Sequence, residues 1–322
     1  MPFLLLAIGI ALLLAGGTLM VQGASGIARQ FNVPTMIIGL TVVAFGTSTP
    51  ELVVNITGAL RGETALAFGN AVGSNIANFG LVLGLVALLS PIYLQGQMVR
   101  RELPFLLLVT AILLVMAWDQ PLSGTPAMLD RGDAIILFLL FTIFVYIMVR
   151  DIIRGKGDPV LIEVEHYPVV RGRSSLSLNI VFVLVGMGLL IYGGSMTIDQ
   201  GTTMAAVLNV PEVVVGTFVV AVGTSLPELA TSAIAAYKKE TDLAVGNIVG
   251  SNIFNTLVVL PAAGIIEPLP IPAGGDLDLA VGFAFVLVVI PLSVFSGARL
   301  GRSAGVALVA SYFAYMAYRF SA

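Results

Sequence analysis

Two glutamates lie within long apolar runs, and the same short motif precedes each of them. Residues 46–51 read Gly-Thr-Ser-Thr-Pro-Glu and end at Glu51, and residues 223–228 read Gly-Thr-Ser-Leu-Pro-Glu and end at Glu228. A carboxylate inside a membrane segment costs about 2.5–3.5 kcal/mol on insertion scales, so it usually faces a partner or a cavity. Two such carboxylates therefore predict a buried site for cations.

The proline of each motif predicts a break in a helix. Pro50 has no backbone N–H, and its ring clashes with the carbonyl of Gly46. We expect the carbonyls from Ala44 to Thr47 to lose their helical partners, and such groups are tolerated at membrane depth only inside protein or beside a cavity. Together with the hydroxyls of Thr47 and Ser48 they form a set of hard oxygen ligands, which suits calcium and alkali cations.

The second motif offers the same groups. Pro227 predicts a break that frees the carbonyls from Ala221 to Thr224, next to the hydroxyl of Ser225. Two ionised glutamates balance one divalent cation, whereas an empty pair repels itself. Protons or monovalent cations must then fill the site when the divalent ion has left, and this charge balance predicts coupled exchange.

Polar residues in the segments that follow complete the predicted cage. Ser74 and Asn78 are four positions apart and share one helix face, and Ser251 and Asn255 repeat this spacing. Serine and asparagine also form hydrogen bonds between membrane helices. The spacing therefore leaves two interpretations open for these four residues, cation ligands or interhelical contacts.

The composition identifies an integral membrane protein. Of the 322 residues, 58% are hydrophobic and 10% are charged, against about 25% charged in soluble domains. There is no cysteine and one histidine, His166, which excludes disulfides and thiolate sites and leaves little for a zinc site or a catalytic triad. We therefore expect a protein that is not an enzyme and has no cofactor, with an intramembrane protease as the least favoured alternative.

A membrane-spanning helix needs about 20 mostly apolar residues. Ten segments meet this requirement approximately, at 3–22, 34–60, 65–90, 102–118, 133–150, 176–198, 211–236, 242–265, 279–296 and 302–320. They predict an all-α transmembrane fold in one integrated domain, with a first half over 1–155, a cytoplasmic loop over 156–175 and a second half over 176–322.

An internal repeat relates the two halves. Glu228 lies 177 positions after Glu51, and the same shift aligns residues 32–34 with 209–211 and residues 73–76 with 250–253. Each half holds five predicted helices, and because five is odd, the second half enters the membrane from the opposite side. We therefore predict two inverted-topology repeats, with helices 2 and 7 broken at the motifs and the site at the repeat interface.

The basic residues predict the orientation. If the N-terminus is outside, the inner loops hold Arg29, Arg100, Arg101, Arg150, Arg154, Lys156, Arg171, Arg173, Lys238, Lys239, Arg299 and Arg302. The outer side keeps Arg61, Arg131 and Arg319. The positive-inside rule thus predicts that both termini are outside, and the short loops favour a prokaryotic inner membrane.

Residues 46–51 and 69–75, with their copies at 223–228 and 246–252, resemble the two alpha-repeats of the cation/calcium exchanger superfamily. Within it, the chain looks like the small prokaryotic sodium/calcium exchangers, and the resemblance extends over nearly its whole length. It implies ten helices, extracellular termini and antiport of sodium for calcium by alternating access. In that mechanism helices 1 and 6 slide over the other eight.

The resemblance also implies a ligand set. It assigns calcium to the carboxylates of Glu51 and Glu228 with the carbonyls of Thr47 and Thr224. It assigns sodium to positions at Ala44, Ser48 and Ser74 towards one side and at Ala221, Ser225 and Ser251 towards the other. Some relatives carry an aspartate at the position of Asn255, so the cage here has two carboxylates instead of three.

The driving ion and the transport class have alternatives. Related proton/calcium exchangers carry a glutamate where this chain has Gly73 and Gly250, which favours sodium. A proton-coupled exchanger of calcium or another divalent cation remains the nearest alternative, and a passive cation channel is a more distant one. The expected partners are calcium, sodium and the lipid bilayer, with no nucleic acid, and a monomer is the expected state.

Overall fold

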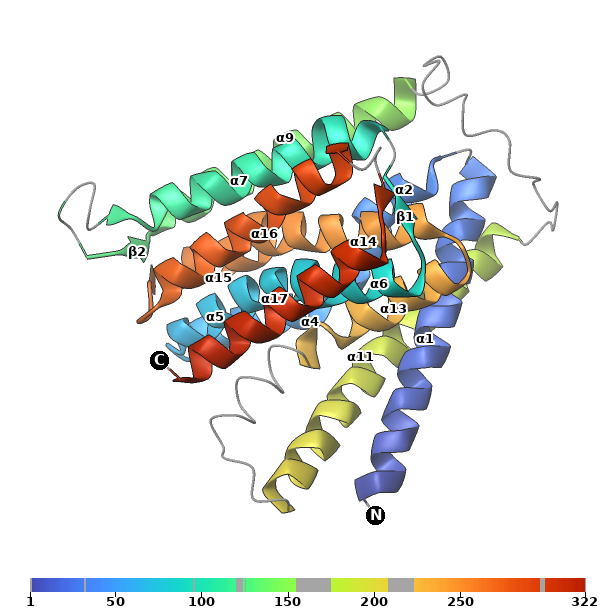
Figure 1. Cartoon of the computed structure of the whole chain (residues 1–322), viewed down its shortest axis with the longest axis horizontal. Coiled ribbons are helices and arrows are strands. Elements are labelled where there is room, and N and C mark those ends of the chain that lie inside the picture. The colour runs from blue at the N-terminus through green and yellow to red at the C-terminus, as the bar shows by residue number, and fades with distance from the viewer. Residues whose placement is uncertain are drawn as a thin grey trace.

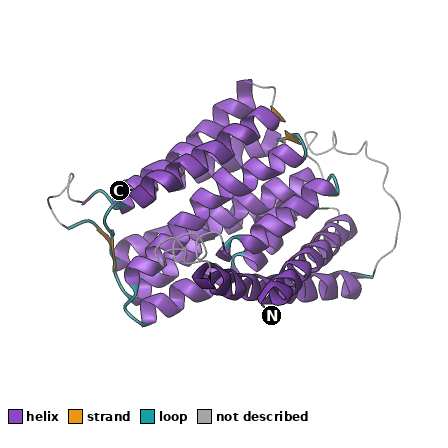
Figure 2. Ribbon diagram, turned by 60° about the horizontal axis from the view of Figure 1, so that its bottom comes forward, coloured by secondary structure: helices purple, strands orange, loops and turns teal. Residues whose placement is uncertain are grey.

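Long apolar runs form a bundle of helices, many of them aligned in one direction (Figure 1). The computed structural model describes residues 2–31, 33–94, 96–119, 124, 126–154, 175–207, 223–295 and 299–321. His166, Ala221 and most of the predicted loop over 156–175 lie outside these ranges, as does the first part of the predicted helix over 211–236. Within the described ranges helix predominates, with a few very short strands (Figure 2).

The first half begins with one long helix and continues with several interrupted ones. Its helices are α1 (Pro2–Phe31), α2 (Thr35–Ile38), α3 (Ala44–Thr47), α4 (Thr49–Leu60), α5 (Thr64–Ala77), α6 (Gly84–Leu89), α7 (Leu103–Met116) and α9 (Arg131–Arg154). Three π-helical segments lie between them, η1 (Gly39–Val43), η2 (Asn78–Leu83) and η3 (Met98–Glu102).

The second half has a similar order. Its helices are α11 (Leu176–Val207), α13 (Leu226–Tyr237), α14 (Thr241–Phe254), α15 (Leu260–Ile266), α16 (Gly275–Phe295) and α17 (Arg302–Ser321), with a π-helical segment η4 (Asn255–Val259). The segments η2 and η4 begin at Asn78 and Asn255, which are equivalent positions of the repeat. Short π-helical segments within α-helices frequently lie at functional sites.

The described residues include six helices long and apolar enough to cross a membrane. A seventh is added if Thr35–Thr47 and Thr49–Leu60, which meet at a bend of 45°, form one span. The predicted all-helical membrane fold is thus confirmed, whereas the number ten stays a prediction. Helices α7, with 14 residues, and α13, with 12, are each shorter than a full span.

Helices α1 and α11 pack closely in opposite directions and project from the rest of the bundle (Figure 1). A Cβ atom at Gly9 would lie 2.6 Å from Thr197 Oγ1, and one at Gly23 would lie 2.6 Å from the carbonyl oxygen of Asn179. Residues near the start of α1 therefore contact residues near the end of α11, and later residues of α1 contact earlier residues of α11, so the two helices are antiparallel. The glycines permit this approach, as small residues do between membrane helices.

Two antiparallel strand pairs among the described residues connect the halves. Strand β1 (Ile92–Tyr93) pairs with β4 (Arg299–Leu300), and β2 (Met128–Leu129) pairs with β3 (Leu269–Pro270). Each pair joins a connection of the first half to one of the second. Together with the packing of α1 on α11, these pairs bring parts of the two halves into direct contact.

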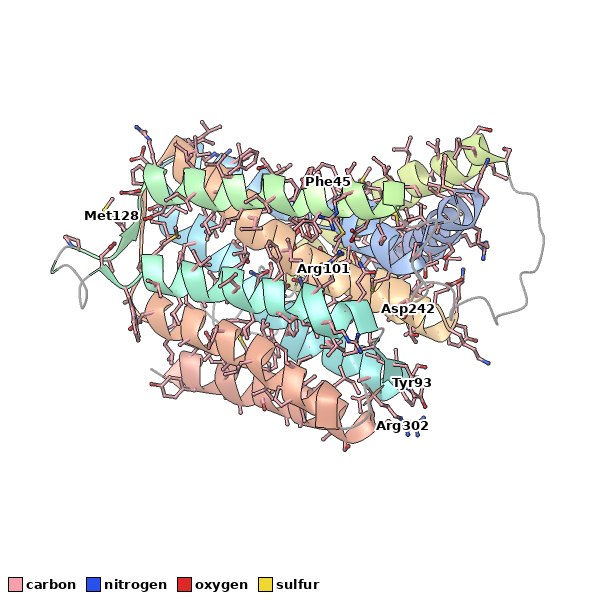
Figure 3. All side chains as sticks on the ribbon, turned by 90° about the horizontal axis from the view of Figure 1, so that it is seen from above. Phe45, Tyr93, Arg101, Met128, Asp242 and Arg302 are labelled. Carbon is pink, nitrogen blue, oxygen red and sulfur yellow. The ribbon has the colours of Figure 1, made fainter. Side chains whose placement is uncertain are left out.

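The connections between helices can be assigned to one or the other end of the bundle. Figure 3 places Tyr93, Asp242 and Arg302 near one end and Met128 near the other. These residues belong to the connection before α7, the start of α14, the start of α17 and the connection before α9. The beginnings of α14 and α17 thus lie at the same end as the chain between α6 and α7.

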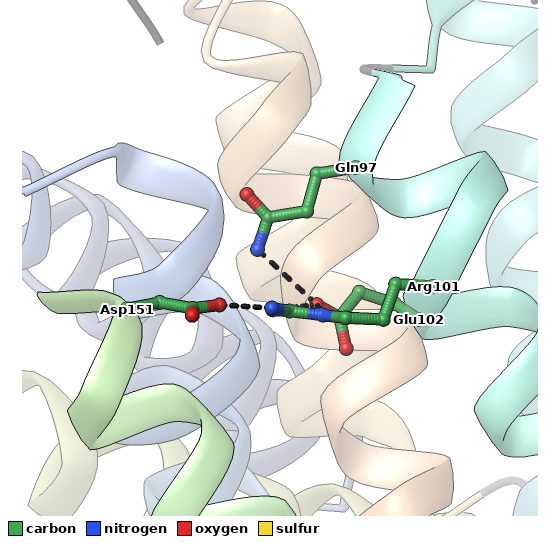
Figure 4. Close-up of polar contacts among 4 residues, drawn as sticks. All are labelled: Gln97, Arg101, Glu102 and Asp151. Carbon is green, nitrogen blue, oxygen red and sulfur yellow. Dashed lines mark hydrogen bonds and ion pairs between the residues drawn. The ribbon is translucent and has the colours of Figure 1, made fainter. Parts of the chain in front are cut away.

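An ionic cluster joins η3 to the end of α9 (Figure 4). Arg101 forms an ion pair with Asp151 and also bonds to Glu102, with Nε 2.8 Å from Oε1 of Glu102. Gln97 donates to the same oxygen at 3.3 Å. The side chain of Glu102 is 1% exposed, so this cluster compensates a buried charge.

Candidate cation site

The first motif breaks its helix at Ser48. Helix α3 ends at Thr47, Ser48 has φ −86° and ψ 9°, and α4 starts at Thr49 with Pro50 in its first turn. Ser225 has φ −84° and ψ 4° before α13, whose first turn contains Pro227. The predicted breaks thus occur at equivalent serines, and each glutamate lies in the first turn of the helix that follows.

One detail of the predicted break is wrong. The carbonyl of Ala44 keeps a helical partner, because it accepts the backbone N–H of Ser48 at 3.0 Å. It also lies 3.4 Å from the hydroxyl of Thr47. Proline at position 50 removes only its own N–H, whose helical acceptor is the carbonyl of Gly46. Ala44 is therefore buried beside the site with its carbonyl in use, although a carbonyl oxygen has a second lone pair.

The two motifs meet in the protein interior. Glu51 and Glu228 are both 0% exposed, and Ser48 donates from Oγ to Oε1 of Glu228 at 2.9 Å. Ser251 donates to the same oxygen at 3.4 Å. The carboxylate from the second half is thus held by a hydroxyl from the break of the first half.

The carboxylate of Glu51 has a different environment. Neither of its oxygens has a hydrogen-bond partner among the residues that the structure describes, and Oε2 of Glu228 has none within the same ranges. The two side chains are close enough to interact electrostatically. Because unpaired buried charges are costly, the pair forms a strong candidate for occupation by a cation.

Two equivalent sets of hydroxyl and amide contacts flank the carboxylates. Thr47 donates to Oδ1 of Asn247 at 3.1 Å, and its equivalent Thr224 donates to Oδ1 of Asn70 at 3.2 Å. Two further hydroxyl pairs are also equivalent in the repeat, Thr47 with Ser251 at 3.5 Å and Thr224 with Ser74 at 3.2 Å. Two of the predicted serines and both predicted threonines therefore form contacts across the two halves.

Each of these asparagines is held by a residue on the preceding helix. Asn70 donates to Asn55 at 2.6 Å, and Asn55 donates to the backbone carbonyl of Ala67 at 2.8 Å. Asn247 donates to Ser232, the equivalent of Asn55, at 2.9 Å. These supporting residues are not among the predicted ligands, although the repeat aligns Asn70 with Asn247.

Asn78 and Asn255 are fully buried but differ in their contacts. Asn78 donates from Nδ2 to Oδ1 of Asn252 at 2.9 Å, and its own Oδ1 has no partner in the described ranges. Neither amide atom of Asn255 has a partner there. Among the predicted site residues, Ser225 is 3% exposed, whereas Ala221 lies outside the described ranges.

The donor set of this site is hydroxyl, amide and carboxylate oxygen. In the part of the chain that the structure describes, no group of three or more His, Cys, Asp or Glu residues could hold a metal ion. A cage of two carboxylates and neutral oxygens is suited to hard cations such as calcium and sodium, and lacks the nitrogen and sulfur ligands that zinc and copper prefer. Two ionised carboxylates carry the charge that balances one divalent cation.

Comparisons with known proteins agree with this donor set. The family described as sodium/calcium exchanger protein matches residues 1–150 and 178–321. The chain is 35% identical to the putative antiporter CaxA of Alkalimonas amylolytica, over 98% of this chain and 97% of that protein. It is also 35% identical to the inner membrane protein YrbG of Escherichia coli (strain K12), over 97% and 95% of the two chains.

A solved structure is similar over almost the whole length. The sodium-calcium exchanger NCX_Mj, soaked with 10 mM Na+ and zero Ca2+, has 28% sequence identity and a TM-score of 0.83, covering 98% of both chains. The family match and the two relatives cover both halves, including both motifs. The chain therefore belongs to the sodium/calcium exchanger family.

Proposed function

We propose that the cage around Glu51 and Glu228 binds the calcium and sodium ions that this antiporter exchanges across the membrane. The observation that carries the proposal is the hydrogen bond of 2.9 Å from Ser48, in the first broken segment, to Glu228, in the second. It joins the two motifs where both carboxylates are fully buried. A cation between them would compensate charges that the protein leaves largely unpaired.

The proposed ligands are the residues predicted from the sequence. They are Glu51, Glu228, Thr47, Thr224, Ser48, Ser225, Ser74, Ser251, Asn78, Asn255, Ala44 and Ala221. The carboxylates would bind calcium with oxygens of the two threonines, and the serines and alanines would contribute to sodium positions. The equivalent hydroxyl contacts in the two halves support this assignment. Ala221 is included on the basis of the sequence alone.

Charge balance supplies the coupling. Two carboxylates neutralise one calcium ion, and after its release they repel each other until sodium ions enter. A carrier of this kind changes its facing when its buried charges are compensated. The close glycine-lined contact between α1 and α11 supports a mechanism of alternating access in which these two helices slide over the others.

We propose ten membrane spans in two inverted halves, with both termini outside and the loop over 156–175 in the cytoplasm. The antiparallel packing of α1 on α11, which are equivalent in the repeat, supports the inversion. The location of Tyr93, Asp242 and Arg302 near one end, opposite Met128, fits the same topology (Figure 3). Similarity to an inner membrane protein supports a prokaryotic inner membrane.

Calcium flux into vesicles tests the function directly. We expect an imposed sodium gradient to drive uptake of radioactive calcium into proteoliposomes, and a pH gradient of equal size to leave uptake at the level of protein-free vesicles. Uptake that follows the pH gradient would instead identify a proton-coupled exchanger. Uptake that needs no counter-ion, together with single-channel currents, would identify a channel.

We further propose that one chain is sufficient for transport, because the carboxylates and the described hydroxyl and amide groups around them come from a single chain. Light scattering of the purified protein, together with reconstitution at less than one chain per vesicle, would test this. Loss of exchange at that dilution would contradict it.

A further inference from the structure

The amides next to the cation cage are arranged differently in the two halves. Four asparagines are involved, in two pairs that the repeat relates, Asn75 with Asn252 and Asn78 with Asn255. Asn78 and Asn255 belong to the proposed cage, whereas Asn75 and Asn252 do not. The contacts of these four side chains decide which amide atom each cage residue presents to a bound ion.

A chain of hydrogen bonds fixes the orientation of Asn78. Asn252 is 2% exposed and donates from Nδ2 to the backbone carbonyl of Asn75 at 3.2 Å. A backbone carbonyl can only accept, so Nδ2 of Asn252 must face it. Oδ1 of Asn252 then faces Asn78 and accepts its Nδ2 at 2.9 Å. The remaining atom of the Asn78 amide is its oxygen.

That oxygen is buried and has no hydrogen-bond partner within the described residues. A buried polar atom without a partner is costly unless water or an ion satisfies it. We propose that Asn252 is a positioning residue of the cation site, which turns the amide of Asn78 so that Oδ1 faces a bound cation and Nδ2 does not. This inference rests on the function proposed above.

The second half lacks the equivalent arrangement. The repeat would pair Nδ2 of Asn255 with Oδ1 of Asn75, but all three of the atoms Asn255 Nδ2, Asn255 Oδ1 and Asn75 Oδ1 are without partners in the described chain. Asn75 donates instead to the hydroxyl of Thr256 at 2.9 Å. The amide of Asn255 is therefore not oriented by its neighbour.

A single sequence difference accounts for this asymmetry. Thr256 is the repeat equivalent of Phe79, and phenylalanine has no acceptor that could hold the amide of Asn252. In the first half, Asn252 is thus available to the carbonyl of Asn75 and to Asn78. In the second half, the hydroxyl of Thr256 holds the amide of Asn75. The amide of Asn75 therefore does not orient Asn255.

Matched leucine substitutions test the inference in the purified full-length protein. Asn252→Leu removes the group that orients Asn78, whereas Asn75→Leu removes an equivalent amide and leaves the backbone carbonyl in place. The half-saturating concentrations of calcium and sodium, the maximal exchange rate and the thermal midpoint are measured for both. We expect Asn252→Leu to raise the half-saturating concentration about tenfold for the ion that Asn78→Leu also weakens, and Asn75→Leu to change it less than about twofold.

A double substitution separates positioning from a general structural effect. If Asn252 acts through Asn78, then Asn78→Leu combined with Asn252→Leu is no weaker in ion binding than Asn78→Leu alone. Additive losses, or equal losses in Asn75→Leu and Asn252→Leu, would overturn the inference. Alanine at positions 75 and 252 repeats the comparison if leucine prevents folding. A wild-type protein that binds neither ion would refute the proposed function, whereas normal binding with an unaffected Asn252→Leu refutes this inference alone.

Discussion

Replacing Glu51 by glutamine separates the cost of the empty site from its affinity for calcium. Both carboxylate oxygens of Glu51 lack a hydrogen-bond partner in the described part of the chain, and the side chain interacts electrostatically with Glu228. A glutamine of almost the same shape keeps an oxygen that the nearby hydroxyls of Ser74 and Thr224 can approach, and it relieves any repulsion. We therefore expect the ion-free variant to unfold at the wild-type temperature or above it.

Calcium binding, in contrast, should become much weaker in the Glu51→Gln variant. Removing one partner of a buried charge pair costs about 3–5 kcal/mol, which at about 1.4 kcal/mol per factor of ten is a roughly 100- to 4,000-fold weaker Kd. At millimolar calcium the variant should then lose the stabilisation that the ion gives to the wild-type protein. Sodium-driven calcium uptake should fall to the level of protein-free vesicles.

The matched substitution Glu228→Gln should weaken calcium binding to the same extent. Without ions, however, the Glu228→Gln protein should be less stable than the Glu51→Gln protein. Ser48 and Ser251 donate to Oε1 of Glu228 at 2.9 and 3.4 Å, and these charge-assisted bonds become neutral ones, with about half the strength. We expect a difference of about 1 kcal/mol in the free energy of unfolding between the two ion-free variants.

The assay is thermal unfolding of purified protein with and without calcium, together with vesicle flux. Glu63→Gln is the control, because it makes the same chemical change at an exposed position between α4 and α5. A Glu51→Gln variant that calcium still stabilises as fully as the wild type would refute the site. An ion-free Glu51→Gln protein clearly less stable than Glu228→Gln would refute the unequal environments of the two carboxylates.

Two further predictions concern packing and charge outside the cage. In Gly186→Ala, the new Cβ would lie 2.7 Å from the backbone nitrogen of Met20, so α1 and α11 must separate at a cost of about 1–3 kcal/mol. The exchange rate should fall while calcium-induced stabilisation persists, and Gly188→Ala, which meets open space, should leave both unchanged. Arg101→Gln removes the ion pair of Glu102, whose side chain is 1% exposed. Because the Arg101 side chain is 32% exposed, the cost should be at most about 3 kcal/mol. The thermal midpoint should fall equally with and without calcium, and not in the exposed control Arg100→Gln.

The breaks and the meeting of the two motifs could be predicted because their causes are local or repeated. Proline removes one N–H and blocks one carbonyl wherever it occurs, so a bend at Ser48 follows from Pro50 alone. The repeat then indicates that the second carboxylate has the same setting. The predicted loss of helical bonds extends too far, to Ala44, because the proline removes one N–H group only, whose acceptor is Gly46, and Ser48 still donates to Ala44.

The supporting amides could not be predicted in the same way. Thr47 and Asn247 are 200 positions apart, and Thr224 and Asn70 are 154 apart. Whether an asparagine caps a helix, packs or orients a ligand depends on which residue of the other half faces it. The sequence does show that Asn70 and Asn247 are equivalent in the repeat, so a role for one of them predicts the same role for the other.

Sequence differences between the two halves can make the ion affinities of the two facing states unequal, which the shared motifs cannot do. If the two halves form the inverted repeat proposed above, they exchange roles when the carrier changes its facing, so identical copies would give both states the same affinity for each ion. The charges of Glu51 and Glu228 and the contacts of Thr47 and Thr224 are equivalent, and they set the total charge in both states. The difference between Phe79 and Thr256 lies one position beyond the cage amides. Because it orients one amide and leaves the other unheld, it makes the two sides of the cage unequal towards a cation.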